Sequence, residues 1–199
     1  LDTGAMYRAL SWYLIKENIN YHNRKNLNSF LNNISIKFKS VKGSNQNVII
    51  NNHDVTEKIR SQEISSIVSS IASIEEVREF LVKEQRKIGD IGGIVAEGRD
   101  IGSKVFPQAE LKIFLTATIN ERAKRRKNEL EAMGCGNIDF EQLKNEIEKR
   151  DFDDSNRKIS PLIKAKDAIE IISDGYTINQ VVEKILEIYF ETIPKELQL

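Results

Sequence analysis

Apolar side chains recur along much of this chain at the spacing of a helix. Residues 5–17 and 178–190 show this period, and a longer helical stretch covers residues 57–88. Ser73 and Glu76 stand three residues apart, as in a capping box, which predicts that the long stretch breaks and restarts near Ser73. The pattern therefore indicates a largely helical chain whose middle helix is divided in two.

A second pattern, in which apolar and polar residues alternate, marks two short segments in the first third of the chain. Residues 34–38 and 47–50 alternate in this way, and a turn cluster at 42–45 separates them. Alternation with a period of two is typical of strands that bury one face. These segments predict a small antiparallel lobe over residues 34–56, inserted between helices.

Three short, mostly apolar runs follow, at residues 94–96, 111–117 and 169–172. Each run is bounded by Gly, Asp or Pro, and helical segments separate the runs. Strands that alternate with helices predict an α/β fold with a parallel, doubly wound sheet. The strands of such a sheet are covered on both faces, so we expect the first two runs to be fully buried.

The composition is that of an ordinary globular protein, with 40% hydrophobic and 30% charged residues. At 199 residues, the chain is long enough for one sizeable core and a small inserted lobe. Lys and Arg together number 30, as do Asp and Glu, so the net charge is zero. We therefore expect neither nucleic acid nor membrane as a partner, and any anion site must come from local clustering of arginines.

Cysteine usage and the length of the apolar runs bear on the compartment. The chain holds one cysteine, Cys135, which excludes a disulfide within these residues and favours a reducing compartment. No apolar run reaches the length of a membrane span, and no signal peptide opens the sequence. We expect a cytoplasmic protein.

Several arginines stand in loops or near helix ends, next to an Asp, a Gly or a Ser. The planar guanidinium group suits bidentate contact with phosphate oxygens, and an enzyme that transfers a phosphoryl group needs several such contacts. The alternative interpretation is that each arginine forms a routine ion pair on the surface. The arginines concerned are Arg8, Arg78, Arg99, Arg150 and Arg157.

Two segments place polar residues directly after a predicted buried strand. In the segment 94–107, a glycine, an arginine and an aspartate follow the strand, and Asp2, Thr3 and Gly4 stand at the end of another strand. Ligands of open α/β sheets bind just beyond the carboxyl ends of the strands. Both segments are therefore candidates for a ligand site.

Four segments, read in order, carry a family resemblance. They are LDTGAMYRA at 1–9, the lobe at 34–56, AEGRDIG at 96–102 with VFP at 105–107, and RDFDDSNR at 150–157 with SPL at 160–162. Together they resemble bacterial cytidylate kinases of the P-loop nucleoside-monophosphate kinase group. The resemblance implies a core kinase domain over 1–33 and 57–199, an inserted CMP-binding lobe over 34–56, and a lid at about 148–162.

The resemblance implies roles for the residues that handle phosphate. Thr3 and Arg8 would border the monophosphate site, with Arg8 on the phosphate of CMP. Arg99 would also reach phosphate. Arg150 and Arg157 would close from the lid over both phosphates, so Arg99, Arg150 and Arg157 are the candidate catalytic residues.

The resemblance also implies which residues contact the base and the sugar. Ser69, Arg78 and Asp100 would read the edge of cytosine, and Asp154 would accept a hydrogen bond from the sugar. A carboxylate suits the amino group of cytosine, and donors suit its acceptors N3 and O2. Uracil has a carbonyl in place of the amino group, so we expect UMP to be a poorer acceptor than CMP or dCMP.

A basic segment at 121–127 has two interpretations that the sequence leaves open. Arg122, Arg125 and Arg126 share one side of a helix, because they are spaced at i, i+3 and i+4. They either face the donor phosphates, with Arg126 as the first candidate, or form a solvated charged face. The clustered acids at 139–154 are interpreted as a solvated helix and lid, and no metal-ligating set is predicted.

One expected element is missing from the 199 residues, since no G-x-x-x-x-G-K-[ST] loop occurs. That loop cradles the donor phosphates and helps to hold Mg²⁺. The resemblance places it immediately before Leu1, so we expect a chain cut at its N-terminus, without the first strand, the P-loop and the first helix. The expected reaction uses Mg²⁺ and ATP as phosphoryl donor and CMP or dCMP as acceptor, in a monomer.

Three interpretations of the function stay open at this point. The chain is a fragment of an active cytidylate kinase, inactive alone; or it is a silent module that binds CMP without transferring phosphate; or it is part of an assembly completed by another chain.

Overall fold

The computed structural model describes residues 1–39, 46–134, 136 and 138–197, which form two compact units. Unit 1 comprises Leu1–Ile101 with Arg157–Ile159, and unit 2 comprises Gly102–Asn156 with Ser160–Leu199. The predicted turn at 42–45 and the cysteine Cys135 lie outside the described residues.

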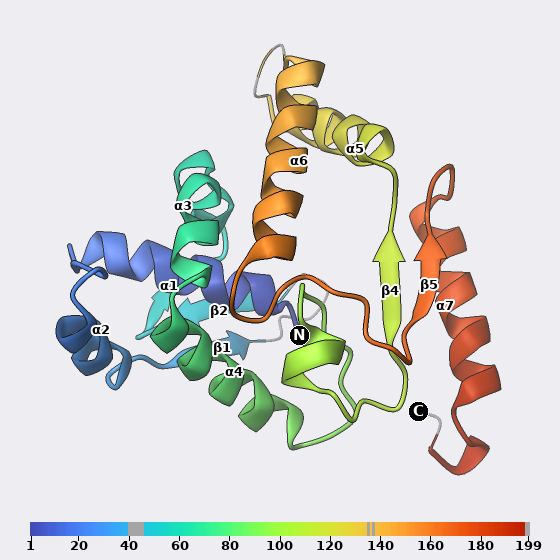
Figure 1. Ribbon diagram of the computed structural model, residues 1–199, viewed down its shortest axis with the longest axis horizontal. Helices are drawn as coiled ribbons and strands as arrows, with labels where there is room; N and C mark the ends of the chain where they lie inside the picture. Colours follow the sequence, from blue (N-terminus) through green and yellow to red (C-terminus); the bar gives the residue numbers. More distant parts are fainter. Residues whose placement is uncertain (40–45, 135, 137, 198–199) are drawn as a thin grey trace. The chain divides into compact units, whose positions relative to one another are not determined.

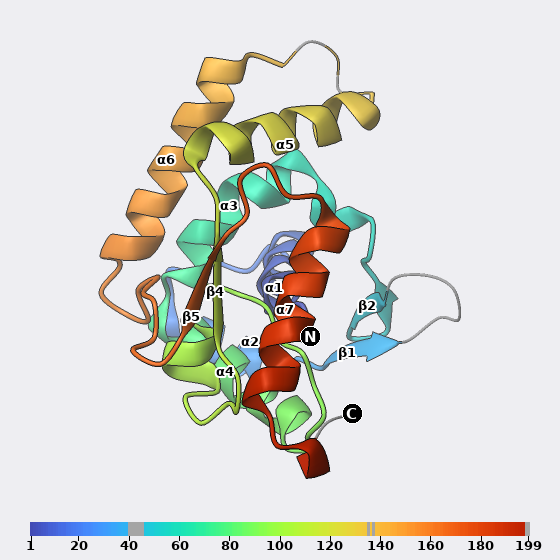
Figure 2. The same cartoon turned by 90° about the vertical axis from the view of Figure 1, so that its right-hand side faces the viewer.

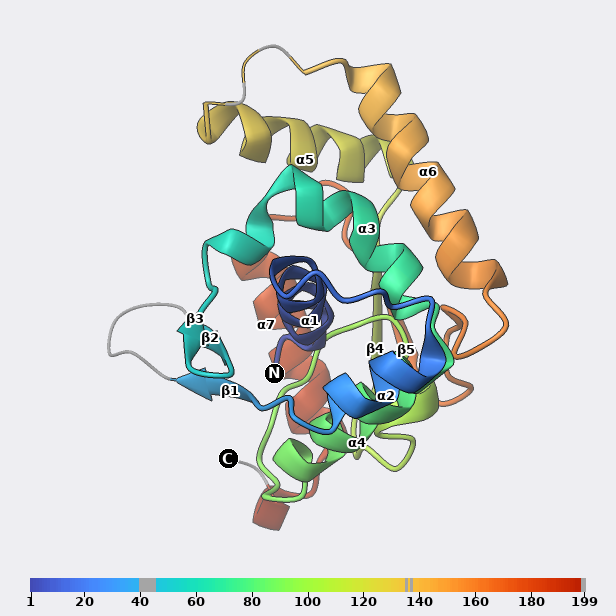
Figure 3. The same ribbon diagram turned by 90° about the vertical axis from the view of Figure 1, so that its left-hand side faces the viewer.

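Unit 1 is organised around α1 (Thr3–Lys16), the helix predicted from the first apolar period. Asp2 caps its N-terminus, and the Asp2 carboxylate accepts a hydrogen bond of 2.7 Å from the backbone N–H of Ala5. Met6, Leu10 and Leu14 recur four residues apart and are fully buried. Figure 3 looks along α1 and shows it between α3 and the strands of the lobe, both of which it contacts.

The antiparallel pairing predicted for the strands of the lobe is confirmed. Strands β1 (Ile36–Lys39), β2 (Asn47–Ile50) and β3 (His53–Asp54) form one antiparallel sheet in the order β1-β2-β3. One face packs on α1, since β2 contacts that helix and its buried side chains join the same core. A short helix, α2 (Arg24–Leu31), precedes the lobe and contacts α4.

The long helical stretch is divided at the predicted place but not by the predicted device. A short 3-10 turn (Lys58–Arg60) is followed by α3 (Gln62–Ala72) and α4 (Glu75–Gly89). The capping box predicted from Ser73 and Glu76 is wrong: α4 begins after Ile74, which makes no capping hydrogen bond through its side chain. The Ser73 hydroxyl instead donates to the Ser70 carbonyl, which closes the end of α3.

The strand predicted at 94–96 is not formed as a strand. Glu97 makes an isolated parallel bridge with Asp2, and Val95 is 84% exposed rather than buried. A parallel strand is buried only where neighbours pair with it and helices cover both faces. The apolar run shows that this segment can be buried. The neighbouring elements determine whether it is buried.

Unit 2 holds the two other predicted strands as a small parallel sheet. Strands β4 (Ile113–Thr116) and β5 (Ile169–Ile172) pair in parallel, with Ile113 opposite Ile169 (Figure 1). The expectation that the first of them is fully buried is wrong, because Leu115 is 52% exposed. In a sheet of two strands, neither strand has a neighbour on both sides, so neither is enclosed as a central strand of a wide sheet is.

Three helices complete unit 2. α5 (Ile119–Ala132) follows β4 and packs against α6 (Phe140–Asn156), which it crosses in Figure 2. α7 (Ile178–Thr192) follows β5 and starts with a capping box formed by Thr177 and Gln180. A π-helical turn (Ile101–Val105) and a terminal 3-10 turn (Lys195–Leu197) are the remaining helical segments of the described chain. None of the helices in the described ranges is both long enough and apolar enough to span a bilayer.

Candidate functional site

The two segments predicted at strand ends lie side by side in unit 1. The backbone N–H of Glu97 donates to the Leu1 carbonyl at 3.0 Å, and the backbone N–H of Thr3 donates to the Glu97 carbonyl at 3.2 Å. The Thr3 hydroxyl donates to the same carbonyl at 2.6 Å. These contacts join the first and the third motif at one place, so Thr3 is buried beside the loop that carries Arg99 and Asp100.

Gly98 is a residue of this junction that the sequence analysis did not single out. An added Cβ atom at Gly98 would lie 2.2 Å from Thr3 Oγ1 and 2.9 Å from Ile101 Cδ1. Side-chain atoms do not approach so closely, so only glycine lets the loop after the strand pass this near to Thr3. The signal that could have identified Gly98 is its place in the AEGRD motif, between two charged residues.

Arg8 follows the capping residue of α1, Asp2, by six residues, or nearly two helical turns. Its guanidinium group forms an ion pair of 2.8 Å with Asp2, and both side chains are partly exposed. The pair orients the guanidinium group toward the N-terminus of α1. Backbone N–H groups at a helix N-terminus attract anions, and a guanidinium group beside them adds a bidentate donor.

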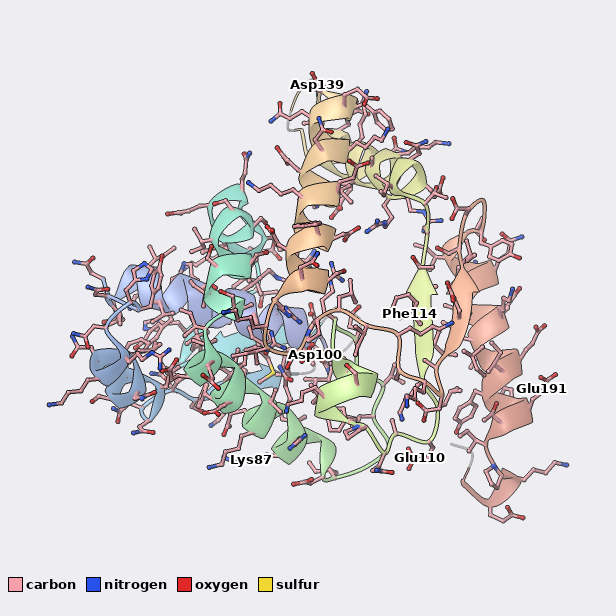
Figure 4. The ribbon with its side chains drawn as sticks, viewed as in Figure 1. Lys87, Asp100, Glu110, Phe114, Asp139 and Glu191 are labelled. Carbon is pink, nitrogen blue, oxygen red and sulfur yellow. The ribbon has the colours of Figure 1, made fainter. Side chains whose placement is uncertain are left out.

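Arg78 and Asp100 form the most deeply buried ion pair of unit 1. Arg78 stands in the first turn of α4 and Asp100, labelled in Figure 4, in the segment beyond α4. The side chains are 3% and 6% exposed, and Arg78 Nη2 donates to Asp100 Oδ2. Arg78 Nη1 also donates to the carbonyl of Ala72 at 3.0 Å. The end of α3 therefore helps to hold the pair, which explains why the division between α3 and α4 matters to the site.

Tyr7 is the second residue that the sequence analysis missed, although it stands within the first motif. Its ring centroid lies 5.3 Å from Arg78 Cζ, so the guanidinium group packs on the aromatic face. Burial raises the pKa of the Tyr7 hydroxyl to about 12, and the positive charges of Arg78 and Arg157 oppose that increase. Tyr7, Arg78, Asp100 and Arg157 therefore interact in one cluster of unit 1.

The remaining predicted residues of unit 1 occupy different surroundings. Ser69 lies half-buried in the last turn of α3, and Arg99 is exposed although its neighbour Asp100 is buried. The predicted convergence of Ser69 with Arg78 and Asp100 stays a prediction. The different roles expected for Arg99 and Asp100, one on phosphate and one on the base, also stay predictions.

The predicted lid residues are divided between the two units. Arg150 is exposed on α6 in unit 2, whereas Arg157 belongs to unit 1. Asp154 is 6% exposed near the end of α6, and its carbonyl accepts a hydrogen bond of 2.8 Å from the backbone N–H of Leu162. The lid and its movement stay predictions.

The three arginines of α5 all bind protein groups within unit 2. Arg122 pairs with Asp151 at 2.5 Å, and Arg125 donates to the Ser173 carbonyl at 2.6 Å. Arg126 pairs with Glu129 at 2.7 Å and is 38% exposed. This last pair has the i, i+3 geometry of a charged helix face, and the contact of Arg126 with donor phosphates stays a prediction.

Two surface hollows of the described chain lie away from the individual residues predicted for the site. One, of about 480 Å³, lies in unit 2 between α5, α6 and Asp174, and another, of about 410 Å³, lies beside β1 and β2. Neither hollow is lined by a residue predicted for the site. We place the site at the predicted residues of unit 1 because buried, paired charges mark functional sites. Within the described ranges, three or more His, Cys, Asp or Glu side chains do not gather to hold a metal ion.

Comparison with known proteins bears on these residues directly. The family profile described as "Cytidylate kinase" matches residues 1–191. The bifunctional pantoate ligase/cytidylate kinase of Prochlorococcus marinus (strain MIT 9312) is 67% identical over 199 residues, which are 100% of this chain and 39% of that protein. The protein of the same name from strain NATL1A is 49% identical over 197 residues, which are 99% of this chain and 38% of that protein.

The chain thus spans about two-fifths of the length of these relatives. The expectation of a P-loop before Leu1 concerns residues outside the printed sequence and stays a prediction. Because the profile covers almost the whole chain, from the Asp2–Glu97 junction through the Arg78–Asp100 pair to α7, the chain belongs to the cytidylate kinase family.

Proposed function

We propose that this domain, a phosphotransferase by its family, transfers the γ-phosphoryl group of ATP to CMP or dCMP and yields ADP with CDP or dCDP. The observation that carries the proposal is the buried pair of Arg78 and Asp100 in a member of the cytidylate kinase family. A buried charge pair is costly to maintain and weak evidence for stability alone. We therefore interpret the pair as a group that recognises a ligand.

Base recognition follows from the chemistry of this pair. The Asp100 carboxylate would accept a hydrogen bond from the amino group of cytosine, while Arg78 and Ser69 would donate to N3 and O2. With UMP, a carbonyl would face the carboxylate, and mispaired buried polar groups cost about 1–3 kcal/mol each. The preference for CMP over UMP would therefore come from the unfavourable hydrogen bonding of uracil with these buried groups.

Phosphate binding would draw on several guanidinium groups. Arg8, at the N-terminus of α1, would hold the phosphate of CMP, next to the hydroxyl of Thr3. Arg99, Arg150 and Arg157 would neutralise the charge that spreads over the group in transit. Asp154 would bind the sugar, and Arg126 would contact the donor. Mg²⁺ would enter as its complex with ATP and would help to neutralise the charge on the phosphates.

The chemical step would be a direct in-line transfer between the two nucleotides. A covalent intermediate on the protein is not needed, because the acceptor phosphate is itself the nucleophile. Closure of the segment at about 148–162 would exclude water, so that ATP is not hydrolysed. The cytoplasmic location and the monomeric state expected from the sequence remain predictions. The pantoate ligase activity in the relatives' names is not assigned to these residues, since the family matched is the kinase.

The experiment is a coupled ADP-release assay on the complete natural polypeptide that contains these 199 residues, with Mg²⁺-ATP and CMP, dCMP, UMP or AMP. We expect kcat/KM for CMP and dCMP to exceed that for UMP by about tenfold or more, which corresponds to one mispaired group. Asp100→Asn should narrow the difference between CMP and UMP, because an amide can also donate to a carbonyl. Equal use of CMP and UMP by the unaltered protein would contradict the proposal.

A further inference from the structure

Three buried polar atoms without a well-formed hydrogen bond gather beside the Arg78–Asp100 pair in unit 1. Among the residues that the structure describes, these atoms are Tyr7 Oη, Gln85 Nε2 and Arg78 Nε. Gln85 is 1% exposed, Arg78 2% and Tyr7 8%. Buried polar groups are nearly always satisfied, so three such atoms in one cluster call for a functional explanation.

The spacing along α4 explains how Gln85 comes to this cluster. Gln85 follows Arg78 by seven residues, which is close to two turns of an α-helix, so both side chains leave α4 on one face. Lys87, two residues further along, is 57% exposed and pairs with Glu84; Figure 4 shows it on the outer side of α4. Gln85 is thus a polar residue on the buried face of a helix whose other face is charged.

Tyr7, on α1, connects the two residues of α4. Its ring lies under the Arg78 guanidinium group, with 5.3 Å between the ring centroid and Cζ. At the other end of the ring, the Gln85 amide is near enough to the Tyr7 hydroxyl to lower its pKa slightly, although neither Tyr7 Oη nor Gln85 Nε2 has a hydrogen-bond partner. We take the two groups as facing each other. A half-turn of the amide would present Oε1, an acceptor, to the hydroxyl.

The Tyr7 ring limits the tilt of the Arg78 guanidinium group out of its own plane. Two hydrogen bonds, to the Ala72 carbonyl and to Asp100, hold the guanidinium group within its plane. A flat surface beneath the group opposes tilting, and the Tyr7 ring provides such a surface. A hydrogen bond from the Tyr7 hydroxyl to the Gln85 amide would prevent the ring from swinging about its side-chain torsions.

We propose that Gln85 is a positioning residue for recognition of the base, which acts through the Tyr7 ring to hold Arg78 and Asp100 in register with cytosine. This inference rests on the proposed function. It adds a residue of α4 that does not touch the nucleotide but sets the selectivity of the residues that do. Loss of the Gln85 amide leaves the pair in place and lets it tilt, so discrimination between bases falls more than turnover does.

The test is a comparison of CMP and UMP as acceptors, with Gln85→Met as the variant. Methionine keeps the length and volume of the side chain and removes its hydrogen bonding. We expect the ratio of kcat/KM for CMP to that for UMP to fall about three- to tenfold, the equivalent of one hydrogen bond, with the loss in KM for CMP rather than in kcat. Lys87→Met, on the exposed side of α4, is the matched control and should leave the ratio unchanged.

A second variant keeps the inference testable if Gln85→Met folds poorly. Tyr7→Phe retains the ring beneath Arg78 and removes the hydroxyl, so it should reduce the same ratio by a similar factor. In the double variant the two effects should not multiply, because each removes the same contact. Multiplying effects, or an unchanged ratio in folded single variants, would overturn the inference.

The outcomes also separate this inference from the proposed function. If the unaltered protein does not prefer CMP to UMP, the proposed function itself fails. If it prefers CMP and both variants keep that preference, base recognition stands and the role of Gln85 fails. A purely structural role would lower the active fraction and reduce CMP and UMP turnover equally, which would also contradict the inference.

Discussion

The two units carry similar patterns of apolar residues but bury these residues to different extents. In unit 1, α1, the lobe, α3 and α4 enclose one continuous core, in which Met6, Leu10 and Leu81 are fully buried. In unit 2, Leu115 on β4 is 52% exposed, and α7 buries none of its described residues. Along α7, one stripe at four-residue spacing is exposed, made of Ile178, Val182, Leu186 and Phe190.

The same contrast holds for charges. The deepest ion pair of unit 1, Arg78 with Asp100, is almost without solvent, whereas the pair of Arg126 with Glu129 in unit 2 is 38% and 47% exposed. Burial magnifies electrostatic interactions and also the cost of leaving one partner alone. We infer that a periodic pattern shows which face of an element can be buried, while the surrounding elements determine whether that face is buried and how much each contact contributes.

The largest expected effect comes from the buried charge pair. Asp100→Ala leaves the Arg78 guanidinium group buried without its carboxylate, so we expect the free energy of unfolding to fall by about 3–5 kcal/mol. Arg126→Ala removes an exposed pair and should cost about 0–1 kcal/mol. Denaturant unfolding of both variants of the natural polypeptide measures the difference. Equal losses would mean that the pair in unit 1 is hydrated in solution.

A smaller difference is expected between two leucines. Leu10→Ala opens a cavity at a fully buried position of α1 and should cost about 2–5 kcal/mol, whereas Leu186→Ala on the exposed stripe of α7 should cost about 1 kcal/mol or less. Hydrogen–deuterium exchange of the peptides that cover α1 and α7 reports each unit separately. A loss for Leu186→Ala as large as that for Leu10→Ala would show that the stripe is covered in the natural polypeptide.

The smallest expected effect is a pH dependence confined to unit 1. Unfolded tyrosine loses its proton near pH 10, whereas burial raises the pKa of Tyr7 to about 12. Between these values the folded state binds more protons than the unfolded state, so the free energy of unfolding falls by about 1.4 kcal/mol per pH unit. The contribution is fully present below about pH 10 and is lost toward pH 12.

The measurement is denaturant unfolding at several alkaline pH values for the unaltered protein and two variants. Tyr7→Phe should lose less stability as the pH rises, because it has no proton to release at this position. Tyr176→Phe, on an exposed residue of unit 2, is the matched control. A Tyr7→Phe variant with the same alkaline slope as the unaltered protein would show that the Tyr7 hydroxyl is hydrated.

Much of the candidate site could be predicted because its residues lie in short motifs. Thr3 and Asp100 were chosen from such motifs and Arg78 from the family resemblance, and the structure buries all three in unit 1. Tyr7, Gln85 and Gly98 were missed for a different reason. Nothing in the local sequence says that a tyrosine of α1 lies beneath an arginine of α4. Nor does it say that the loop passes so near Thr3 that a Cβ atom at Gly98 would lie 2.2 Å from Thr3 Oγ1.

The sequence by itself determined the elements of this protein. Periods of 3.6 and 2 are local properties, so the helix α1, the divided stretch of α3 and α4, the antiparallel lobe and strands β4 and β5 could all be expected from them. Only the tertiary structure decided burial and pairing. The exposure of Val95 and Leu115, the parallel bridge between Asp2 and Glu97, and the contact of Tyr7 with Arg78 depend on residues distant in the chain, and a local pattern holds no information about those neighbours.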